Sequence, residues 1–244
     1  MATFVLIHGA WHGGWCFDEI KPMLEAAGHI VLAPDLPGMG GTAEELAAVT
    51  LSGWADFAAG LCRHAAAPVI LCGHSRGGIV ISEAAERIPE RIAALVYICA
   101  MMIPDGMSRA AWREQSEPNP AFVAIQHPHP SGAATIIDPT HAISVFAQLS
   151  PREMAETAVT RLVAEPNGPR TEAQQLTAAR FGRVPRHYVE CLHDRAIPIA
   201  DQRRMQTLLP CETVTTLATD HSPFLSMPRE LVDSLLAILE RTTS

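Results

Sequence analysis

Residues 73–77 read Gly-His-Ser-Arg-Gly, a G-x-S-x-G pattern whose central Ser75 could act as a nucleophile. An apolar run rich in strand-forming residues precedes the pattern (68–72), and a run of helical character follows it (77–85). A serine on a sharp strand-to-helix turn exposes its hydroxyl, and flanking glycines leave room for the strained backbone. This context predicts that Ser75 is a catalytic nucleophile rather than part of a plain turn.

A serine hydroxyl is a poor nucleophile at neutral pH, so it needs a base within hydrogen-bond reach and an acid that orients the base. His221 is the best candidate base of eleven histidines, because it lies between the last predicted strand and the last predicted helix. Asp194 is the best candidate acid, since it follows the preceding strand and leaves room for one helix and one strand before His221. Asp105, after the fourth predicted strand, is the alternative acid, whereas Asp220 adjoins His221 and should point elsewhere.

Attack by a serine on an ester creates an oxyanion, which backbone amides must stabilise. We expect one amide to be that of Arg76, directly after the nucleophile. The second should come from the loop that follows the first strand, and Ala10 is the best candidate there. In the same loop, Trp11 and His12 could equally line the substrate pocket or pack in the core.

Continuous apolar runs alternate with helical patterns, which predicts an α/β fold with a six-stranded, mostly parallel sheet flanked by helices. The predicted strands cover residues 3–7, 30–33, 69–72, 92–99, 187–191 and 212–217, and the predicted helices cover residues 15–27, 51–65, 77–88, 200–208 and 229–241. We expect residues 1–100 and 184–244 to form the core of this fold.

Residues 101–183 break the alternation, with many prolines and short helical pieces at residues 107–115 and 150–163. They lie between two strands at the carboxyl edge of the sheet, where ligands bind in open α/β sheets. We expect an inserted helical cap over the active site, with a plain surface excursion as the alternative. The candidate pocket residues of the cap, each of which could also simply pack, are Trp112, Phe122 and Phe146.

The composition argues against several classes of protein. The chain has 244 residues and a formal net charge of −8, and no basic run suggests a nucleic-acid or membrane partner. No apolar run is long enough to cross a membrane, and the first residues lack the features of a signal peptide, so we expect a cytoplasmic protein. The six cysteines contain no C-x-x-C pair, and His127, His129 and His141 have no carboxylate at ligand spacing, so neither a metal nor a cofactor is predicted.

Four segments spread over nearly the whole chain carry a resemblance to a known family. They are residues 5–15 (VLIHGAWHGGW), 71–78 (LCGHSRGG), 194–198 (DRAIP) and 220–224 (DHSPF). They resemble the plant methylesterase and hydroxynitrile lyase branch of the α/β-hydrolases and its bacterial relatives, which include pyrethroid-type carboxylesterases. The resemblance implies the α/β-hydrolase fold and a homodimer. It also implies a triad of Ser75, Asp194 and His221 and an oxyanion hole at Ala10 and Arg76.

Two chemistries occur in this branch, and local residues separate them. The lyases of the rubber-tree and cassava type carry a threonine, a lysine and a glutamate where this chain has Ala10, Ser222 and His74. Ala10 cannot hydrogen-bond a cyanohydrin hydroxyl, and Ser222 offers no cation for leaving cyanide. We therefore expect a serine carboxylesterase that hydrolyses small to medium hydrophobic esters through an acyl-enzyme. A hydroxynitrile lyase or another carbon–carbon lyase, and a non-catalytic small-molecule receptor, are the alternatives.

Overall fold

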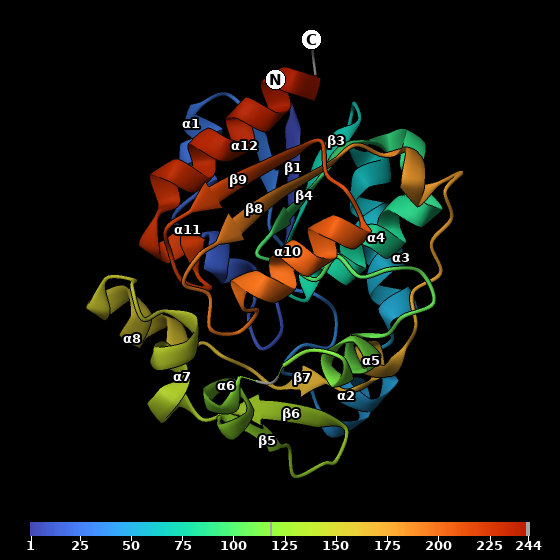
Figure 1. Cartoon of the computed structure of the whole chain (residues 1–244). Helices are drawn as coiled ribbons and strands as arrows, with labels where there is room; N and C mark the ends of the chain where they lie inside the picture. Colours follow the sequence, from blue (N-terminus) through green and yellow to red (C-terminus); the bar gives the residue numbers. More distant parts are fainter. Residues whose placement is uncertain (118, 243–244) are drawn as a thin grey trace.

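Six parallel strands form the central sheet in the order β2-β1-β3-β4-β8-β9 (Figure 1). The computed structural model describes residues 1–117 and 119–242. The strands are β1 (Thr3–Ile7), β2 (Ile30–Leu32), β3 (Val69–His74), β4 (Ile92–Ile98), β8 (Arg186–Cys191) and β9 (Thr213–Leu217). The predicted six-stranded parallel sheet is therefore confirmed, and each strand lies within a few residues of its expected position.

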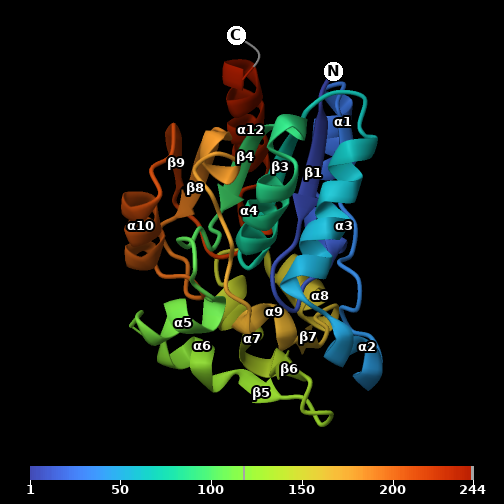
Figure 2. The same cartoon turned by 90° about the vertical axis from the view of Figure 1, so that its right-hand side faces the viewer.

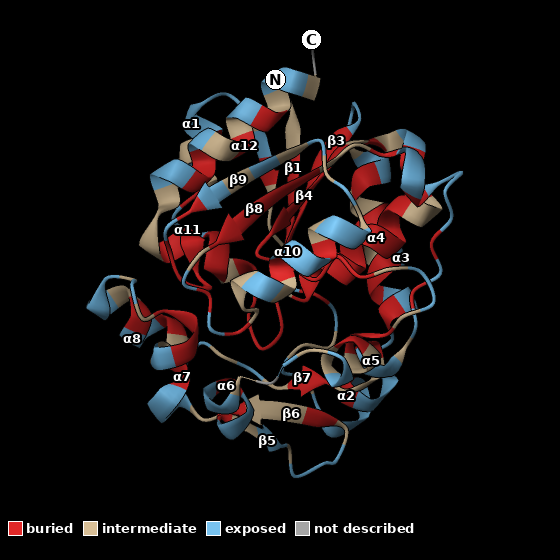
Figure 3. Cartoon of the chain, in the orientation of Figure 1, coloured by how far each residue is buried: buried red, intermediate tan, exposed pale blue. Residues whose placement is uncertain are grey.

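Helices cover both faces of this sheet, which explains why its central strands are continuous apolar runs. In β1 and β3, successive side chains point to opposite faces and enter two separate hydrophobic clusters. One cluster includes residues of α3 (Leu51–His64), α4 (Gly77–Arg87) and α10 (Ile199–Leu208), and the other includes residues of α1 (Lys21–Ala26) and α12 (Pro228–Thr242). The buried strands between exposed outer helix faces are visible in Figure 3.

The first predicted helix, over residues 15–27, is wrong as a single element. A short 3-10 helix (Gly14–Phe17) is followed by the separate helix α1, whose first turn contains Pro22. Proline has no amide hydrogen to donate, so it suits the first turn of a helix but interrupts one that would continue through it. The proline therefore marks the start of α1 rather than its middle.

The segment between β4 and β8 lies beyond the carboxyl ends of the strands, below the sheet in Figures 1 and 2. It contains α5 (Arg109–Glu114), α6 (Pro120–Ala124), α7 (Pro139–Phe146), α8 (Arg152–Thr160) and α9 (Gly168–Thr171). It also contains a three-stranded antiparallel sheet of β5 (Gln126–Pro128), β6 (Ala134–Ile137) and β7 (Glu165–Pro166). The expectation of a helical insertion was thus incomplete, because strands of two to four residues are too short to show an alternating pattern.

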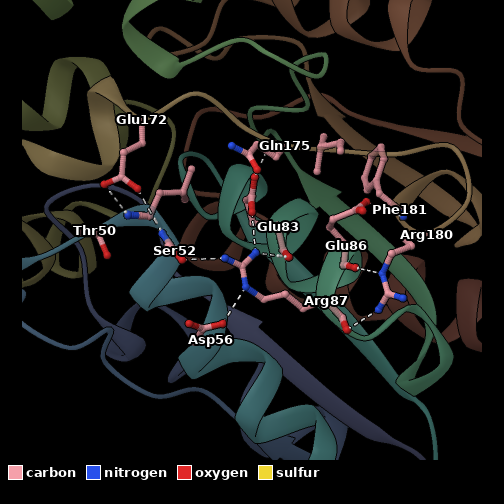
Figure 4. A network of polar contacts seen from close by, with 12 residues as sticks. Thr50, Ser52, Asp56, Glu83, Glu86, Arg87, Glu172, Gln175, Arg180 and Phe181 are labelled. Atoms are coloured by element: carbon pink, nitrogen blue, oxygen red, sulfur yellow. Dashed lines mark hydrogen bonds and ion pairs between the residues drawn. The ribbon is translucent and has the colours of Figure 1, made fainter.

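Carboxylates of α4 hold the segment that returns from this insertion to β8 (Figure 4). Glu83 accepts a hydrogen bond from the amide of Gln175 at 2.6 Å. Three residues further along the same helix, Glu86 accepts hydrogen bonds from the amides of Thr177 at 2.8 Å and Phe181 at 3.1 Å. Because α4 directly follows Ser75, these contacts attach the insertion to the helix of the expected nucleophile.

Neither a helix that could cross a membrane nor a paired cysteine is found among residues 1–117 and 119–242. Burial raises the pKa of the Cys62 thiol to about 12 and also raises that of Cys72. These buried thiols stay protonated at neutral pH and act as small apolar side chains.

Candidate active site

Ser75 lies at the tip of a tight turn between β3 and α4, with a backbone φ of 53°. The left-handed region is rare for a residue with a side chain, and it persists here because the surroundings fix the backbone. The Ser75 amide donates to the carbonyl of Ile98 at 3.2 Å. A Cβ at Gly73 would come within 2.7 Å of the Gly77 carbonyl group, and one at Gly77 would come within 2.5 Å of the Ile7 oxygen. Glycines are therefore required on both sides of the serine.

His221 connects the serine to a carboxylate. Its Nε2 lies 3.0 Å from Ser75 Oγ, and its Nδ1 lies 2.7 Å from Asp194 Oδ2. The imidazole comes from the loop between β9 and α11 (Pro223–Ser226), and Asp194 follows β8. Because an ionised carboxylate accepts the Nδ1 proton, Nε2 is left with a lone pair directed at the serine hydroxyl. The structure thus brings together the expected nucleophile, base and acid.

Asp194 is itself fixed in place by three further donors. Its Oδ1 accepts hydrogen bonds from the amides of Ala196 at 2.7 Å and Ile197 at 2.8 Å. Gln202 in α10 donates from Nε2 to Asp194 Oδ2 at 3.2 Å. These contacts orient the carboxylate toward the imidazole. Gln202 was not identified from the sequence, where nothing distinguishes it from other polar helix residues.

The two other acids considered from the sequence contact different groups. Asp105 accepts a hydrogen bond from the amide of Leu176 at 2.7 Å. Asp220 accepts one from the amide of Leu149 at 2.7 Å, so it attaches the insertion to the loop of His221. In the described part of the chain, Asp194 is the only carboxylate that forms a hydrogen bond with His221.

His74 supports the backbone of His221. Its Nε2 donates to the His221 carbonyl oxygen at 2.8 Å, and the two ring centroids are 4.7 Å apart. Burial and the neighbouring His221 hold the pKa of His74 well below its usual value, so its ring stays neutral. The role of His74 was not foreseen, although it precedes the nucleophile in the sequence.

One group of described side chains has the spacing of a metal site: His74, Cys99 and His221 have ligand atoms within 4.8 Å of one another. Both nitrogens of His221 are already used, by Asp194 and by Ser75. Burial raises the pKa of Cys99, so it presents a neutral thiol, whereas metals bind the thiolate. The donor set therefore does not suit a metal ion.

Two amides, one in the loop after β1 and one in the turn of Ser75, are free to bind an anion. Within residues 1–117 and 119–242, neither the amide of Ala10 nor that of Arg76 donates to another protein group. The next amide, that of Trp11, donates to Glu165 Oε2 at 3.3 Å, and Arg76 Nη2 donates to the Gly9 carbonyl at 3.0 Å. These contacts fix the loop after β1, and the start of α4 adds the positive end of its dipole.

The space directly over Ser75 is small and its lining is mostly apolar. It measures about 20 Å³, close to the volume that one water molecule needs. Three of the expected pocket residues line it, namely Trp11, Phe122 and Phe146. A larger cavity of about 500 Å³ adjoins it, and Trp112, the fourth expected residue, lines that one. The residues shared by both spaces are Met101, Arg113, Ala196 and Ile197.

His12, the fifth expected pocket residue, lines neither of these two spaces. Its Nδ1 donates to the Ala10 carbonyl oxygen at 2.7 Å, and its ring stacks on Trp15 with centroids 5.3 Å apart. Burial lowers the pKa of His12 to about 4, so the ring is neutral at physiological pH. In this structure His12 packs beside Trp15, which is one of the two roles that the sequence left open for it.

A buried cluster of charges borders the site. Glu165 Oε1 accepts from Arg76 Nε at 3.0 Å and from Arg109 Nη1 at 3.2 Å, and all three side chains are nearly inaccessible. Burial lowers the pKa of Arg109 to about 9, against the opposing effect of Glu165. Arg76 and Glu165 are 89 residues apart in the chain, so no local pattern could have predicted their contact.

The chain is similar in sequence and in structure to known proteins. The model of a family described as the Alpha/beta hydrolase family matches residues 4–234. A pyrethroid hydrolase of Sphingobium wenxiniae is 32% identical over 252 residues, which cover 96% of this chain and 86% of that protein. Salicylic acid-binding protein 2 of Nicotiana tabacum is 32% identical over 253 residues, which cover 98% of this chain and 97% of that one. The crystal structure of a pyrethroid hydrolase from Sphingobium faniae JZ-2 has a TM-score of 0.87 and 30% identity, over 98% of this chain and 97% of that one.

Proposed function

The chain belongs to the alpha/beta hydrolase family, and from that premise we propose that it is a serine carboxylesterase for small to medium hydrophobic esters. The observation that carries the proposal is the unbroken series of contacts from Ser75 through His221 to Asp194. The names of the relatives support it, since a pyrethroid hydrolase cleaves an ester. A homodimer and a cytoplasmic location stay predictions.

In the proposed mechanism, Ser75 Oγ attacks the ester carbonyl carbon while His221 Nε2 takes the hydroxyl proton. The carbonyl oxygen becomes an oxyanion, which accepts hydrogen bonds from the amides of Ala10 and Arg76. Asp194 stabilises the imidazolium and keeps it oriented. The bond to the leaving oxygen then breaks, and His221 donates its proton to the departing alcohol. Water repeats the cycle on the acyl-enzyme, releases the carboxylic acid and restores Ser75.

The lining of the site supports hydrophobic substrates. Trp11, Phe122 and Phe146 form apolar walls around Ser75, and each is almost fully buried. The adjoining cavity has the volume of an ordinary small-molecule site. Since the space at the serine holds little more than a water molecule, side chains of the insertion must move when an acyl group enters.

A receptor function is the second candidate, because one relative is named for binding salicylic acid. A pure receptor has no use for a serine in contact with a histidine and a carboxylate. The contacts of Ser75 therefore favour the esterase, and the two functions differ in whether bound ester is turned over.

The proposal is tested by following p-nitrophenyl butyrate hydrolysis and mandelonitrile cleavage near pH 8. The native protein, Ser75→Ala and the control Ser234→Ala, a half-buried serine of α12 outside the site, should be compared. We expect ester turnover in the native protein and the control, a loss of at least about 10³-fold in Ser75→Ala, and no cyanide release. Cyanide release would instead indicate a lyase, and tight binding without turnover would indicate a receptor.

A further inference from the structure

A buried cluster beside Ser75 contains two arginines and one carboxylate. Arg76 and Arg109 share a single carboxylate, Glu165, so one positive charge of this cluster is not balanced. Arg76 is also held by the Gly9 carbonyl. The guanidinium of Arg109 has one hydrogen bond to the described residues, from Nη1 to Glu165, although only about 5% of the residue is exposed. Most of its donors are therefore available to a ligand.

Arg109 and Arg113 both face the space that contains Ser75. The guanidinium of Arg113 has no hydrogen bond or ion pair to the described residues, and it lies 4.7 Å from the centre of the Phe122 ring. The larger cavity is lined by Arg113 and Arg170 and by three acids, Glu114, Glu117 and Asp201. None of these acids lines the space at the serine, where Arg109 and Arg113 are the arginines of the lining and no carboxylate is among the described lining residues.

An unbalanced buried charge is costly unless something compensates it. The aromatic faces compensate in part: Arg109 lies 5.5 Å from the centre of the Trp11 ring, and Arg113 stacks on Phe122. Burial lowers the pKa of Arg109 only to about 9, so its charge persists at neutral pH. An anion in this space would complete the balance, and a planar carboxylate matches the fork of a guanidinium.

We propose that the preferred substrates are esters that also carry a carboxylate, such as monoesters of dicarboxylic acids, and that Arg109 and Arg113 bind this carboxylate while Ser75 attacks the ester. The inference rests on the proposed esterase function and narrows its substrate class. The overall charge of −8 does not oppose it, because local charges decide what a buried pocket accepts. The carboxylate can belong to either the acyl or the alcohol part of the ester, and the test separates the two.

The test uses two pairs of esters of matched shape. Mono(p-nitrophenyl) adipate is compared with p-nitrophenyl hexanoate for a charge on the acyl side, and 4-acetoxybenzoate with 4-methylphenyl acetate for one on the alcohol side. In the native enzyme we expect kcat/KM for one anionic ester to exceed that of its neutral partner by about tenfold or more, mainly through a lower KM.

Arginine variants decide whether these side chains cause the preference. The ratio of anionic to neutral kcat/KM should fall to near one in Arg109→Gln and in Arg113→Gln and stay unchanged in Arg152→Gln, an exposed arginine of α8. Arg113→Gln keeps the test decisive if Arg109→Gln does not fold, because the Arg113 guanidinium has no hydrogen bond or ion pair within the described chain. A native ratio near or below one for both pairs, or a ratio unchanged in both variants, would overturn this inference alone. Absence of turnover of all four esters would overturn the esterase function and this inference with it.

Discussion

Glu165 shows how one residue of the insertion controls the groups around the nucleophile. It accepts hydrogen bonds from the Trp11 amide, from Arg76 and from Arg109. The first contact fixes the loop that carries the free Ala10 amide, and the second fixes the side chain that follows Ser75. A single carboxylate from β7 therefore supports both sides of the proposed oxyanion hole.

Glu165→Gln should be strongly destabilising, because it leaves two buried guanidinium groups without a counter-charge. We expect the free energy of unfolding to fall by about 3 kcal/mol, measured by urea denaturation. The matched control is Glu156→Gln, which breaks the exposed pair of Glu156 with Arg152 and should have no measurable effect. Equally small losses of unfolding free energy in Glu165→Gln and Glu156→Gln would show that the buried cluster stabilises the fold no more than an exposed ion pair does.

The backbone strain at Ser75 gives a second prediction. Its φ of 53° is costly for any side chain but not for glycine. Ser75→Gly should therefore unfold with a free energy about 1 kcal/mol higher than Ser75→Ala, although both lack the nucleophile.

The same pair of changes at Ser234, within α12, should give the opposite order, because glycine destabilises a regular helix. If Ser75→Gly also had a lower free energy of unfolding than Ser75→Ala, the backbone at Ser75 would not be strained.

Three residues of the site were predictable from the sequence because each follows a strand in a fixed order along the chain. Ser75, Asp194 and His221 needed only that order and the pattern around the serine. The residues that support them did not: Glu165, Gln202 and Arg109 act through contacts between distant segments, and their local sequences resemble those of ordinary surface positions. The sequence could not decide between pocket lining and packing for His12, because a histidine beside a predicted site can do either.

At the scale of elements, α4 connects the nucleophile to the insertion. Its carboxylate Glu86 holds the amides of Thr177 and Phe181, in the segment that returns to β8 (Figure 4). Glu86→Ala should release these amides, so we expect their hydrogen exchange to be about tenfold faster, measured by mass spectrometry.

The control for Glu86→Ala is Glu90→Ala, which removes an exposed carboxylate four residues further along the chain. Exchange in residues 177–181 should be the same in this variant as in the native protein. Unchanged exchange in Glu86→Ala would show that the return segment is held by other contacts.

The same scale shows which elements the sequence reveals. Buried parallel strands are long apolar runs, and the helices between them have clear patterns, so the core was predictable. The insertion was not, because its strands of two to four residues pair with one another rather than with the main sheet. Their positions depend on contacts with the core, among them the ion pairs of Glu165, which no local pattern reports.

At the scale of the whole molecule, the arginines at the site contrast with the negative net charge of the chain. The chain is acidic, yet the buried part of the site is rich in arginine. Three neutral histidines also lie near it: burial lowers the pKa of His8 to about 3 and of His12 to about 4, and holds that of His74 well below its usual value.

These histidines predict how stability depends on pH. In the unfolded chain each binds a proton below its ordinary pKa of about 6.5, while the folded protein does not, so acid favours unfolding. The free energy of unfolding should therefore fall as the pH decreases from about 6.5 toward 5, by up to about 1.4 kcal/mol per pH unit for each histidine. Urea denaturation at several pH values would measure this slope.

His12→Gln should reduce that slope, and His127→Gln, at an exposed position, should leave it unchanged. Stability that is constant between pH 6.5 and 5 would contradict the neutral state of the three buried rings.

The most direct test of the account is covalent labelling of the nucleophile, followed by mass spectrometry of the intact protein and its peptides. We predict that diisopropyl fluorophosphate adds a single group, that the group is on Ser75, and that labelling of His221→Gln is slower by about 100-fold or more because the hydroxyl loses its base. Labelling of a residue other than Ser75, or the absence of any adduct on a folded protein, would contradict the conclusion that Ser75 is an activated nucleophile.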